Sequence, residues 1–142
     1  MCNPITTDSP DVLLAKGVHE GYEWEVTSNR LGFRCGYVRI PAGHPWHGKG
    51  YDDVEPYPDV HGGLTFAEHD TDCGKGGEDN AWWVGFDCAH YMDAPDPELP
   101  GYDTHLDVMQ KYGTVKSTAY VRAECARLAE QAAEAVTQPP PV

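Results

Sequence analysis

Histidine and carboxylate side chains gather in the middle of this 142-residue chain. Six of the seven histidines and fourteen of the 23 acidic residues lie between His44 and His105, where the only basic residues are two lysines. Imidazole and carboxylate groups together suit zinc and similar divalent ions, and they also serve as general acids and bases. We therefore expect a functional site in this stretch.

The first hypothesis is a divalent metal site, with zinc as its most natural occupant. The predicted ligands are His61, Asp87 and His90, with His44 or His47 as a further one. Three ligands of these types that leave one position open could activate a water molecule for hydrolysis. Residues 87 and 90 would point to opposite faces of a regular strand, so the chain must turn if both are to reach one ion. The spacings match no established ligand signature.

A hydrolase of this kind would also need a base, for which Asp52 or Asp53 is the candidate. A calcium loop fits the sequence less well. Asp70, Asp72 and the glycine at 74 resemble the start of such a loop, but Lys75 stands where glycine is needed and the twelfth position has no glutamate. No substrate follows from these residues.

Cysteine offers a different chemistry. Cys88 could act as a nucleophile served by His61 or His90, because a neighbouring base or positive group lowers the pKa of a thiol. The adjacent Asp87 works against this, and a buried structural cysteine is the alternative interpretation. The five cysteines are odd in number and form no C-x-x-C pair, which indicates free thiols in a reducing compartment.

Non-catalytic binding is a further hypothesis, since aromatic walls with a few polar groups are typical of small-molecule pockets. The predicted lining residues are Trp46, Tyr51, Thr65 and Trp82, together with His61, Asp87 and His90. Trp82 and Trp83 could instead belong to the core. Gly62 and Gly63, two glycines in an expected strand, indicate either a bulge or a close approach by backbone or ligand.

The net charge of −13 favours some partners over others. Such a field repels phosphate backbones, so we expect no direct nucleic-acid binding. Small cations, cationic proteins and proteins that bind DNA are electrostatically favoured. Two acidic runs, residues 52–55 and 93–98, could imitate a phosphate backbone and occupy a DNA-binding protein, although charge runs are usually solvated faces.

Strands are expected to position most of these groups. Alternating side chains from Tyr22 and a β-rich segment over residues 33–40, with a polar loop between them, predict an antiparallel hairpin. Residues 60–68 and 81–88 predict two more strands, the second central because it is nearly all apolar. Residues 41–59 are expected to form a long ordered loop.

One helix is predicted, from Ser117 or Thr118 to about Val136. Its apolar residues recur at four-three-four-three spacing and so form one stripe that can pack on a sheet. They are Val121, Cys125, Leu128, Ala132 and Ala135. Residues 1–20 are expected to form a loosely packed arm.

Length and composition predict one domain over residues 1–136, followed by a flexible proline-rich tail over residues 137–142. No apolar run approaches the ~18 residues of a membrane helix, and the first residues do not resemble a signal peptide. We therefore expect a cytoplasmic protein without membrane contact.

Several short segments resemble a family of small proteins of no established activity that bacteriophages and prophages encode. They are RCGYV at 34–38, PAGHP at 41–45, YDDV at 51–54, HGGLT at 61–65 and GFDCAH at 85–90. The resemblance covers roughly residues 22–93 and the beginning of the expected helix. It implies a phage or prophage origin and a place in the host cytoplasm, but it brings no catalytic residue.

The sequence as a whole predicts an α+β fold, with an antiparallel sheet of about four strands, one C-terminal helix packed across it and long polar loops. The predicted function is that of a phage accessory protein that acts on host metabolism or defence through a His/Asp pocket, with metal-assisted hydrolysis as the reaction. Sequestration of a small molecule, or acidic DNA mimicry directed at a host protein, are the alternatives.

Overall fold

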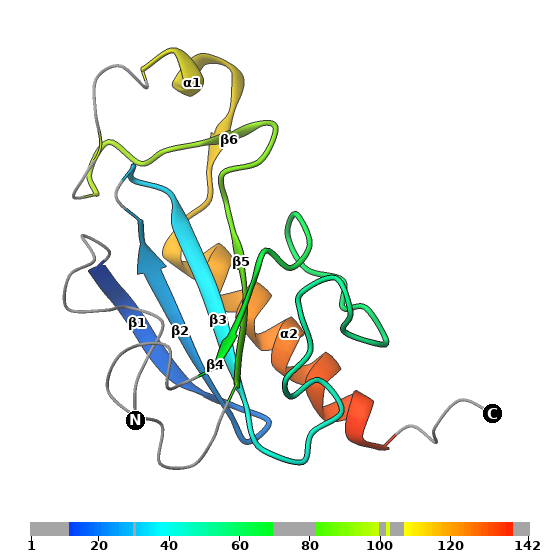
Figure 1. The fold of residues 1–142 in the computed structure, drawn as a ribbon. Coiled ribbons are helices and arrows are strands. Elements are labelled where there is room, and N and C mark those ends of the chain that lie inside the picture. The colour runs from blue at the N-terminus through cyan, green and yellow to red at the C-terminus, as the bar shows by residue number, and fades with distance from the viewer. Residues whose placement is uncertain (1–11, 30, 70–81, 100–101, 103–106, 138–142) are drawn as a thin grey trace.

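The computed structural model describes residues 12–29, 31–69, 82–99, 102 and 107–137. It shows the predicted α+β arrangement, with five strands in one antiparallel sheet and a long C-terminal helix (Figure 1). The sheet has the order β1-β2-β3-β5-β4. Its strands are β1 (Val12–His19), β2 (Tyr22–Ser28), β3 (Arg34–Ile40), β4 (Phe66–His69) and β5 (Trp82–Asp87).

The edge strand β1 corrects the expectation of a loose arm over residues 1–20. It pairs antiparallel with β2 from Val12 opposite Ser28 to His19 opposite Tyr22, with an irregularity between Leu13 and Ala15. The hairpin turn is Glu20-Gly21, and both residues have positive φ, 54° and 83°. Two positive φ values are typical of the two-residue turns that match the twist of a hairpin. Residues 1–11 lie outside the described part of the chain.

The predicted hairpin of β2 and β3 is confirmed, with Trp24 opposite Val38 and Ser28 opposite Arg34. Asn29 closes the loop between them, because its side-chain oxygen accepts the amide hydrogens of Leu31 and Phe33 at 2.9 and 3.1 Å. Asparagine often stabilises a turn in this way, by bonding to the backbone a few residues further on.

The strand expected over residues 60–68 is wrong in its extent, since β4 covers only Phe66–His69. The chain turns at Gly62 and Gly63, which have φ values of 68° and 80° that a strand does not contain. The strand expected over residues 81–88 is β5, which has β3 on one side and β4 on the other. Its inner position agrees with its apolar sequence.

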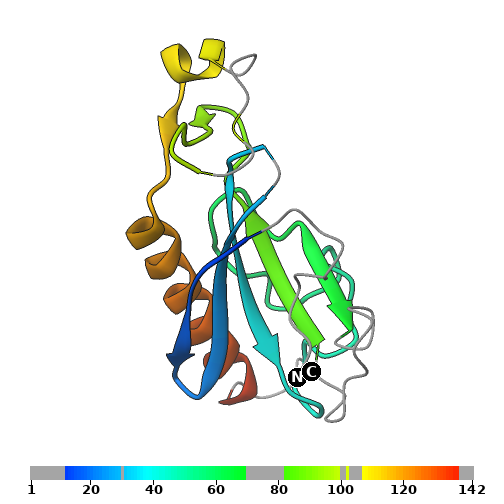
Figure 2. The same ribbon diagram turned by 90° about the vertical axis from the view of Figure 1, so that its left-hand side faces the viewer.

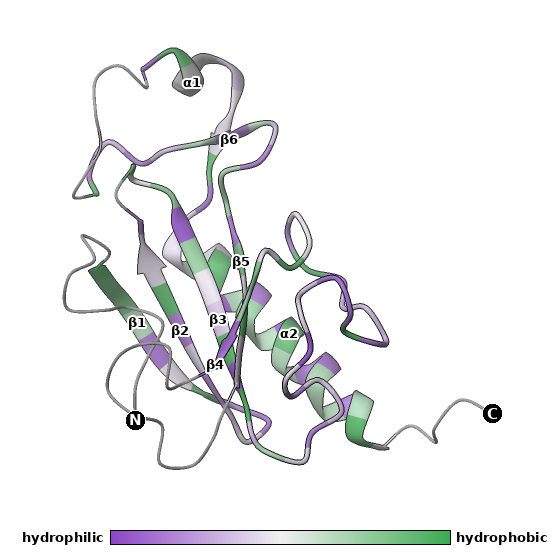
Figure 3. Cartoon of the chain, viewed as in Figure 1, coloured by the Kyte–Doolittle hydropathy of each residue, from purple (hydrophilic) through white to green (hydrophobic). Residues whose placement is uncertain are grey.

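Helix α2 (Thr118–Thr137) covers one face of the sheet and contacts β1, β2 and β3 (Figure 2). Ser117 caps it, with its hydroxyl oxygen 3.1 Å from the amide nitrogen of Tyr120. All five residues of the predicted stripe are buried. Hydrophobic and hydrophilic stretches alternate along the helix (Figure 3), as expected for a helix with one buried side.

The long loop over residues 41–59 is ordered, as predicted, and contributes to the same core. Trp46 is fully buried and Val54 is 1% exposed. The opposite face of the sheet has a second, smaller apolar cluster, formed by Cys35, Tyr37 and Trp83 with Phe66 packed against it. One layer of helix and loop therefore lies on one face, and the other face carries side chains of β3, β4 and β5.

A short parallel pair of strands, β6 (Asp93–Ala94) and β7 (Thr114–Val115), and the helix α1 (Asp107–Tyr112) lie beyond the end of the main sheet. Elements this short carry no periodic signal that a sequence could reveal. No helix of the described residues is long and apolar enough to cross a bilayer. Residues 138–142, most of the predicted tail, are outside the described residues.

Candidate functional site

The two glycines after His61 make room for two side chains. A β-carbon on Gly62 would lie 2.2 Å from Cδ2 of His90, and one on Gly63 would lie 2.9 Å from the hydroxyl oxygen of Tyr57. Both glycines have the left-handed conformation that L-residues with side chains rarely adopt. The sequence indicates a bulge or a close approach by backbone or ligand here, whereas the groups that approach these glycines are an imidazole ring and a phenol.

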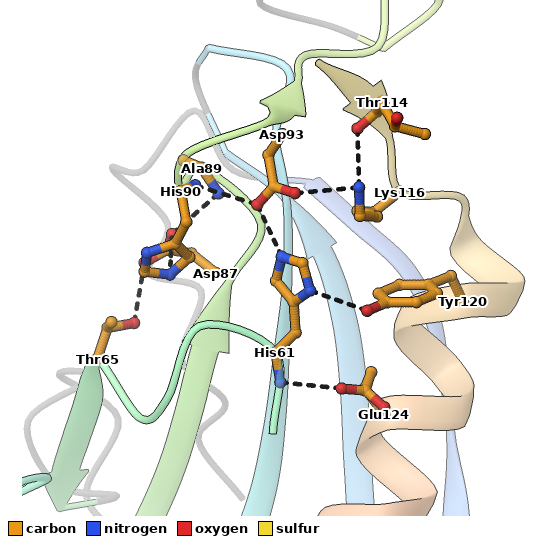
Figure 4. Close-up of polar contacts among 10 residues, drawn as sticks. All are labelled: His61, Thr65, Asp87, Ala89, His90, Asp93, Thr114, Lys116, Tyr120 and Glu124. Atoms are coloured by element: carbon orange, nitrogen blue, oxygen red, sulfur yellow. Dashed lines mark hydrogen bonds and ion pairs between the residues drawn. The ribbon is translucent and has the colours of Figure 1, made fainter. Parts of the chain in front are cut away.

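The chain turns sharply after β5, as a site containing both Asp87 and His90 requires. Oδ1 of Asp87 accepts the amide hydrogen of Ala89 at 3.0 Å, and the amide of Asp93 donates to the carbonyl of His90 at 2.9 Å. These two bonds fold the chain back on itself. His90 consequently lies on the same side of the turn as Asp87 (Figure 4).

Asp87, His90 and Thr65 form one polar group. The Thr65 hydroxyl donates to Oδ2 of Asp87 at 2.9 Å. Nε2 of His90 lies 3.2 Å from Oδ1 of Asp87, without the alignment of a hydrogen bond. The Asp87 and His90 side chains are 30% and 34% exposed, so both are accessible to a ligand.

A cleft of about 510 Å³ opens at this group, at the end of β5. Its described lining residues are Asn29, Cys35, Tyr37, Thr65, Phe66, Phe86, Asp87, Ala89 and His90. The rings of Tyr37 and Phe66 meet edge to face, with centroids 5.1 Å apart. The volume, the aromatic walls and the few polar groups are typical of a small-molecule site.

Gly85 helps to form the wall of this cleft. It pairs with Tyr37 on β3 and with Phe66 on β4. A β-carbon at this position would lie 2.4 Å from Cδ1 of Tyr37. The missing side chain therefore gives the Tyr37 ring the space in which it lies.

A second polar group lies beside the first, on the side of α2, and its centre is Asp93 (Figure 4). Oδ2 of Asp93 is 2.7 Å from Nε2 of His61 and accepts the amide hydrogen of His90 at 3.0 Å. Oδ1 lies 3.2 Å from Nζ of Lys116. The Asp93 side chain is only 2% exposed. Burial would raise the pKa of this carboxyl, but its hydrogen bonds with His61, His90 and Lys116 together lower it.

Both ring nitrogens and the backbone amide of His61 are bonded to other residues of the chain. Nδ1 is 2.9 Å from the hydroxyl of Tyr120, and the backbone amide donates to Oε1 of Glu124 at 2.9 Å. Burial, assisted by the charge of Glu124, raises the pKa of Tyr120, so the phenol keeps its proton. With both ring nitrogens bonded, His61 links the Gly62 turn to α2 and to Asp93.

The predicted metal ligands are only partly brought together. The rings of His61 and His90 have centroids 6.1 Å apart, and His90 contacts Asp87. A metal ion on His61 would have to displace Asp93 or Tyr120 from a ring nitrogen. Among the described residues, no group of three or more His, Cys, Asp or Glu side chains is arranged to hold a metal ion. Zinc as a cofactor stays a prediction.

His44, the further predicted ligand, lies elsewhere. Its Nδ1 accepts the amide hydrogen of Trp46 at 2.9 Å, and its Nε2 is 2.8 Å from the carbonyl oxygen of Ala132. Ala132 is twelve residues after Tyr120 on the same helix, which corresponds to about 18 Å. His44 therefore anchors the 41–59 loop to the far end of α2.

The remaining predicted residues are also distributed over other parts of the molecule. Asp52 and Asp53 are exposed in a turn that the Asp53 amide closes by donating to Gly50. Tyr51 is 44% exposed, whereas Trp46 belongs to the core. Trp82 is at the opposite end of β5 from Asp87, where its indole donates to the carbonyl of Lys49 at 3.1 Å. Of the four predicted lining residues, only Thr65 lines the cleft.

The Cys88 thiol has the properties of a structural cysteine. It is 3% exposed and belongs to the main core cluster. Burial raises its pKa strongly, and the nearby carboxylates of Asp93 and Asp87 add to this. A thiol in these surroundings stays protonated and is a poor nucleophile.

Sequence reasoning missed the most buried acid of the site. Asp93 belongs to the acidic run over residues 93–98, for which the sequence suggests a solvated or DNA-mimicking surface. Its position three residues after His90, with two large residues between them, is compatible with a tight turn. Tyr37 and Phe66 were also missed as site residues, because the register of the strands brings them to the cleft.

No family model matches this chain, and the curated proteins and solved structures contain no significant match to it. The site is therefore interpreted from its own geometry.

Proposed function

We propose that this protein binds a small molecule in the cleft formed by Thr65, Asp87 and His90, and that binding rather than hydrolysis is its role. The observation that supports this is the coincidence of a cleft of about 510 Å³ with an accessible Asp–His pair against aromatic walls. Cavities of this size and composition take molecules of metabolite size. His61 supports the turn from behind and does not take part in ligand contact.

On the resemblance described above, we further propose that the protein is a phage or prophage accessory protein that sequesters its ligand in the host cytoplasm. Metal-assisted hydrolysis fits the site less well, because the ring nitrogens of His61 are already bonded to Asp93 and Tyr120. DNA mimicry by residues 93–98 also fits less well, because the first carboxylate of this run, Asp93, is buried and paired with His61 and Lys116.

The test is a fragment screen by protein-observed NMR on the ¹⁵N-labelled chain. Fragments that bind are expected to shift the amide signals of Thr65, Phe66 and residues 87–90, and the shifts should disappear in Asp87→Ala and His90→Ala. His19→Ala is the matched control, because that imidazole is similarly exposed, 37% against 34%, but lies on β1. Fragments that bind elsewhere and are insensitive to Asp87→Ala and His90→Ala would contradict the proposal.

A further inference from the structure

The polar groups of the cleft are mostly hydrogen-bond acceptors. The Asp87 carboxylate accepts hydrogen bonds from the Ala89 amide and from Thr65, which uses its only hydroxyl hydrogen for this bond. Nε2 of His90 lies 3.2 Å from this carboxylate without the alignment of a hydrogen bond, and the electrostatic attraction of the carboxylate favours the tautomer with the hydrogen on Nε2. In that tautomer Nδ1 is an acceptor, to which no described residue is bonded.

Donors and positive charges are scarce in the same cleft. No lysine or arginine is among its described lining residues. Asn29 contributes an amide group, but its oxygen already accepts the amide hydrogens of Leu31 and Phe33, which leaves its NH₂ group as a donor. A phosphate or carboxylate ligand would therefore meet Asp87 without a compensating cation from these described residues, at an energetic cost.

The aromatic walls complement a positive ligand as well. The rings of Tyr37 and Phe66 line the cleft, and the π-systems of such rings attract cations electrostatically. The electrostatic field of the whole chain is negative and also favours a cation, because the net charge is −13. A negative field raises the local concentration of cations and their rate of association.

We infer that the ligand is an organic cation with N–H donors, of the guanidinium or primary ammonium class. The cation bonds to the Asp87 carboxylate, one N–H donates to Nδ1 of His90, and the apolar part lies against Tyr37 and Phe66. This inference rests on the proposed function, because it names the class of ligand for the same cleft.

A matched pair of ligands tests the charge. Butylguanidinium and butylurea have nearly the same shape, but only the first is a cation. By isothermal titration calorimetry and NMR, butylguanidinium is expected to bind at least about tenfold more tightly, since hydrogen bonds between charged partners are stronger than neutral ones. Added salt should weaken the binding of butylguanidinium and leave the binding of butylurea unchanged.

Variants of Asp87 and Thr65 test whether the Asp87 carboxylate causes the preference for the cation. Asp87→Asn should bring butylguanidinium to the affinity of butylurea, while His19→Ala should keep the wild-type preference. Thr65→Val, which removes a bond to Asp87 but leaves its charge, should keep the preference for the cation and serves as a second variant if Asp87→Asn does not fold. Thermal melting of each variant establishes that it is folded.

The results separate the two proposals. Equal affinity for both ligands, with shifts at the cleft that depend on Asp87, would overturn the cation inference and leave the binding function standing. Cleft-directed fragments that are neutral or anionic, without any butylguanidinium binding, would overturn it in the same way. If no fragment and neither ligand perturbs the cleft residues, both proposals are wrong.

Discussion

At Gly62, both the backbone conformation and the position of the His90 ring require a residue without a side chain. Its φ is 68°, and a β-carbon there would lie 2.2 Å from the His90 ring, which leaves no room for a side chain. Gly62→Ala should therefore lower the free energy of unfolding by about 1 to 3 kcal/mol and displace His90. Chemical denaturation measures the first effect, and the NMR signals of the His90 ring report the second.

Gly21→Ala provides the control, because Gly21 also has a positive φ, 83°, but no atom within 4 Å of its β-carbon position. It should share the backbone strain and leave the His90 signals unchanged. Equal losses of stability in both variants with an unmoved His90 would show that the ring does not pack against Gly62.

The buried carboxylate of Asp93 should make the free energy of unfolding depend on pH in the acid range. Its carboxyl pKa is lower in the folded chain than the usual 3.8, so the stability it contributes is present above that pH and is lost as the pH falls further. Asp93→Asn should lower the free energy of unfolding at pH 7 by on the order of 2 to 4 kcal/mol, because the half-buried Lys116 loses its counter-charge and His61 loses its carboxylate partner. Its stability should also fall less steeply below about pH 4 than that of the wild type.

Asp59→Asn is the control, since the Asp59 side chain pairs with Arg127 but is 90% exposed. Exposed pairs contribute little, so this variant should follow the wild-type curve. An Asp93→Asn protein as stable as the wild type across the acid range would contradict the central place of Asp93 in the polar group.

At the scale of elements, His44 joins the 41–59 loop to α2, and this contact should be sensitive to pH. Burial lowers the pKa of His44 below its usual 6.5, against the effect of the Ala132 carbonyl. The unfolded chain then binds a proton at a pH where the folded chain does not, so acidification through pH 6.5 destabilises the fold. His44→Gln should be less stable at pH 8, by about 1 to 3 kcal/mol, and should show a flatter profile between about pH 8 and 5.

Denaturant unfolding at several pH values measures this profile, with His19→Gln as the exposed counterpart. The difference between wild type and variant isolates His44 from the other histidines. A slope that His44→Gln leaves unchanged would show that this imidazole does not titrate with folding.

The elements that carry a regular pattern could be predicted from the sequence. The stripe of α2 follows from local periodicity and is as expected. The alternation of β2 predicts the strand itself, but Glu25 and Thr27 on its other face are buried as well, so β2 is not half-buried. Strand β1 was missed because its apolar run over residues 12–15 does not alternate and its register is irregular between Leu13 and Ala15. The strand predicted over residues 60–68 was too long because the apolar residues Val60 and Leu64 reach the core from a turn at Gly62 and Gly63 and not from a strand.

At the scale of the whole molecule, the acidic surface is expected to act as a field and not as a set of specific contacts. Asp52 and Asp53 are exposed, and the described contacts do not connect their side chains with the cleft. The double variant Asp52→Asn/Asp53→Asn should change the free energy of unfolding by less than about 1 kcal/mol. It should weaken butylguanidinium binding only slightly, and only at low salt, where long-range charge is unscreened.

Calorimetry at two salt concentrations, compared with Asp87→Asn, measures this. A large loss of cation affinity that persists at high salt would place Asp52 or Asp53 at the site, as the sequence suggests. The same comparison distinguishes a local carboxylate from the general charge of the chain.

The site could be predicted only in part, for a reason that belongs to the whole fold. Thr65, Asp87 and His90 stand out by their residue types and their nearby glycines, and the structure brings them together. His44 and Trp46 have equally suggestive types, but tertiary packing places them in the core near the far end of α2. Asp93 and the aromatic walls depend on strand register and on a turn, which residue types alone do not specify.

The most direct test of the cleft is the state of the His90 ring, observed by long-range ¹H–¹⁵N NMR of the histidine side chains with and without saturating butylguanidinium. We expect free His90 to carry its hydrogen on Nε2 and the ligand to shift its Nδ1 signal, while the signals of both His61 nitrogens stay unchanged. A His90 spectrum that does not change at saturation, or a ligand response confined to His61, would contradict this expectation.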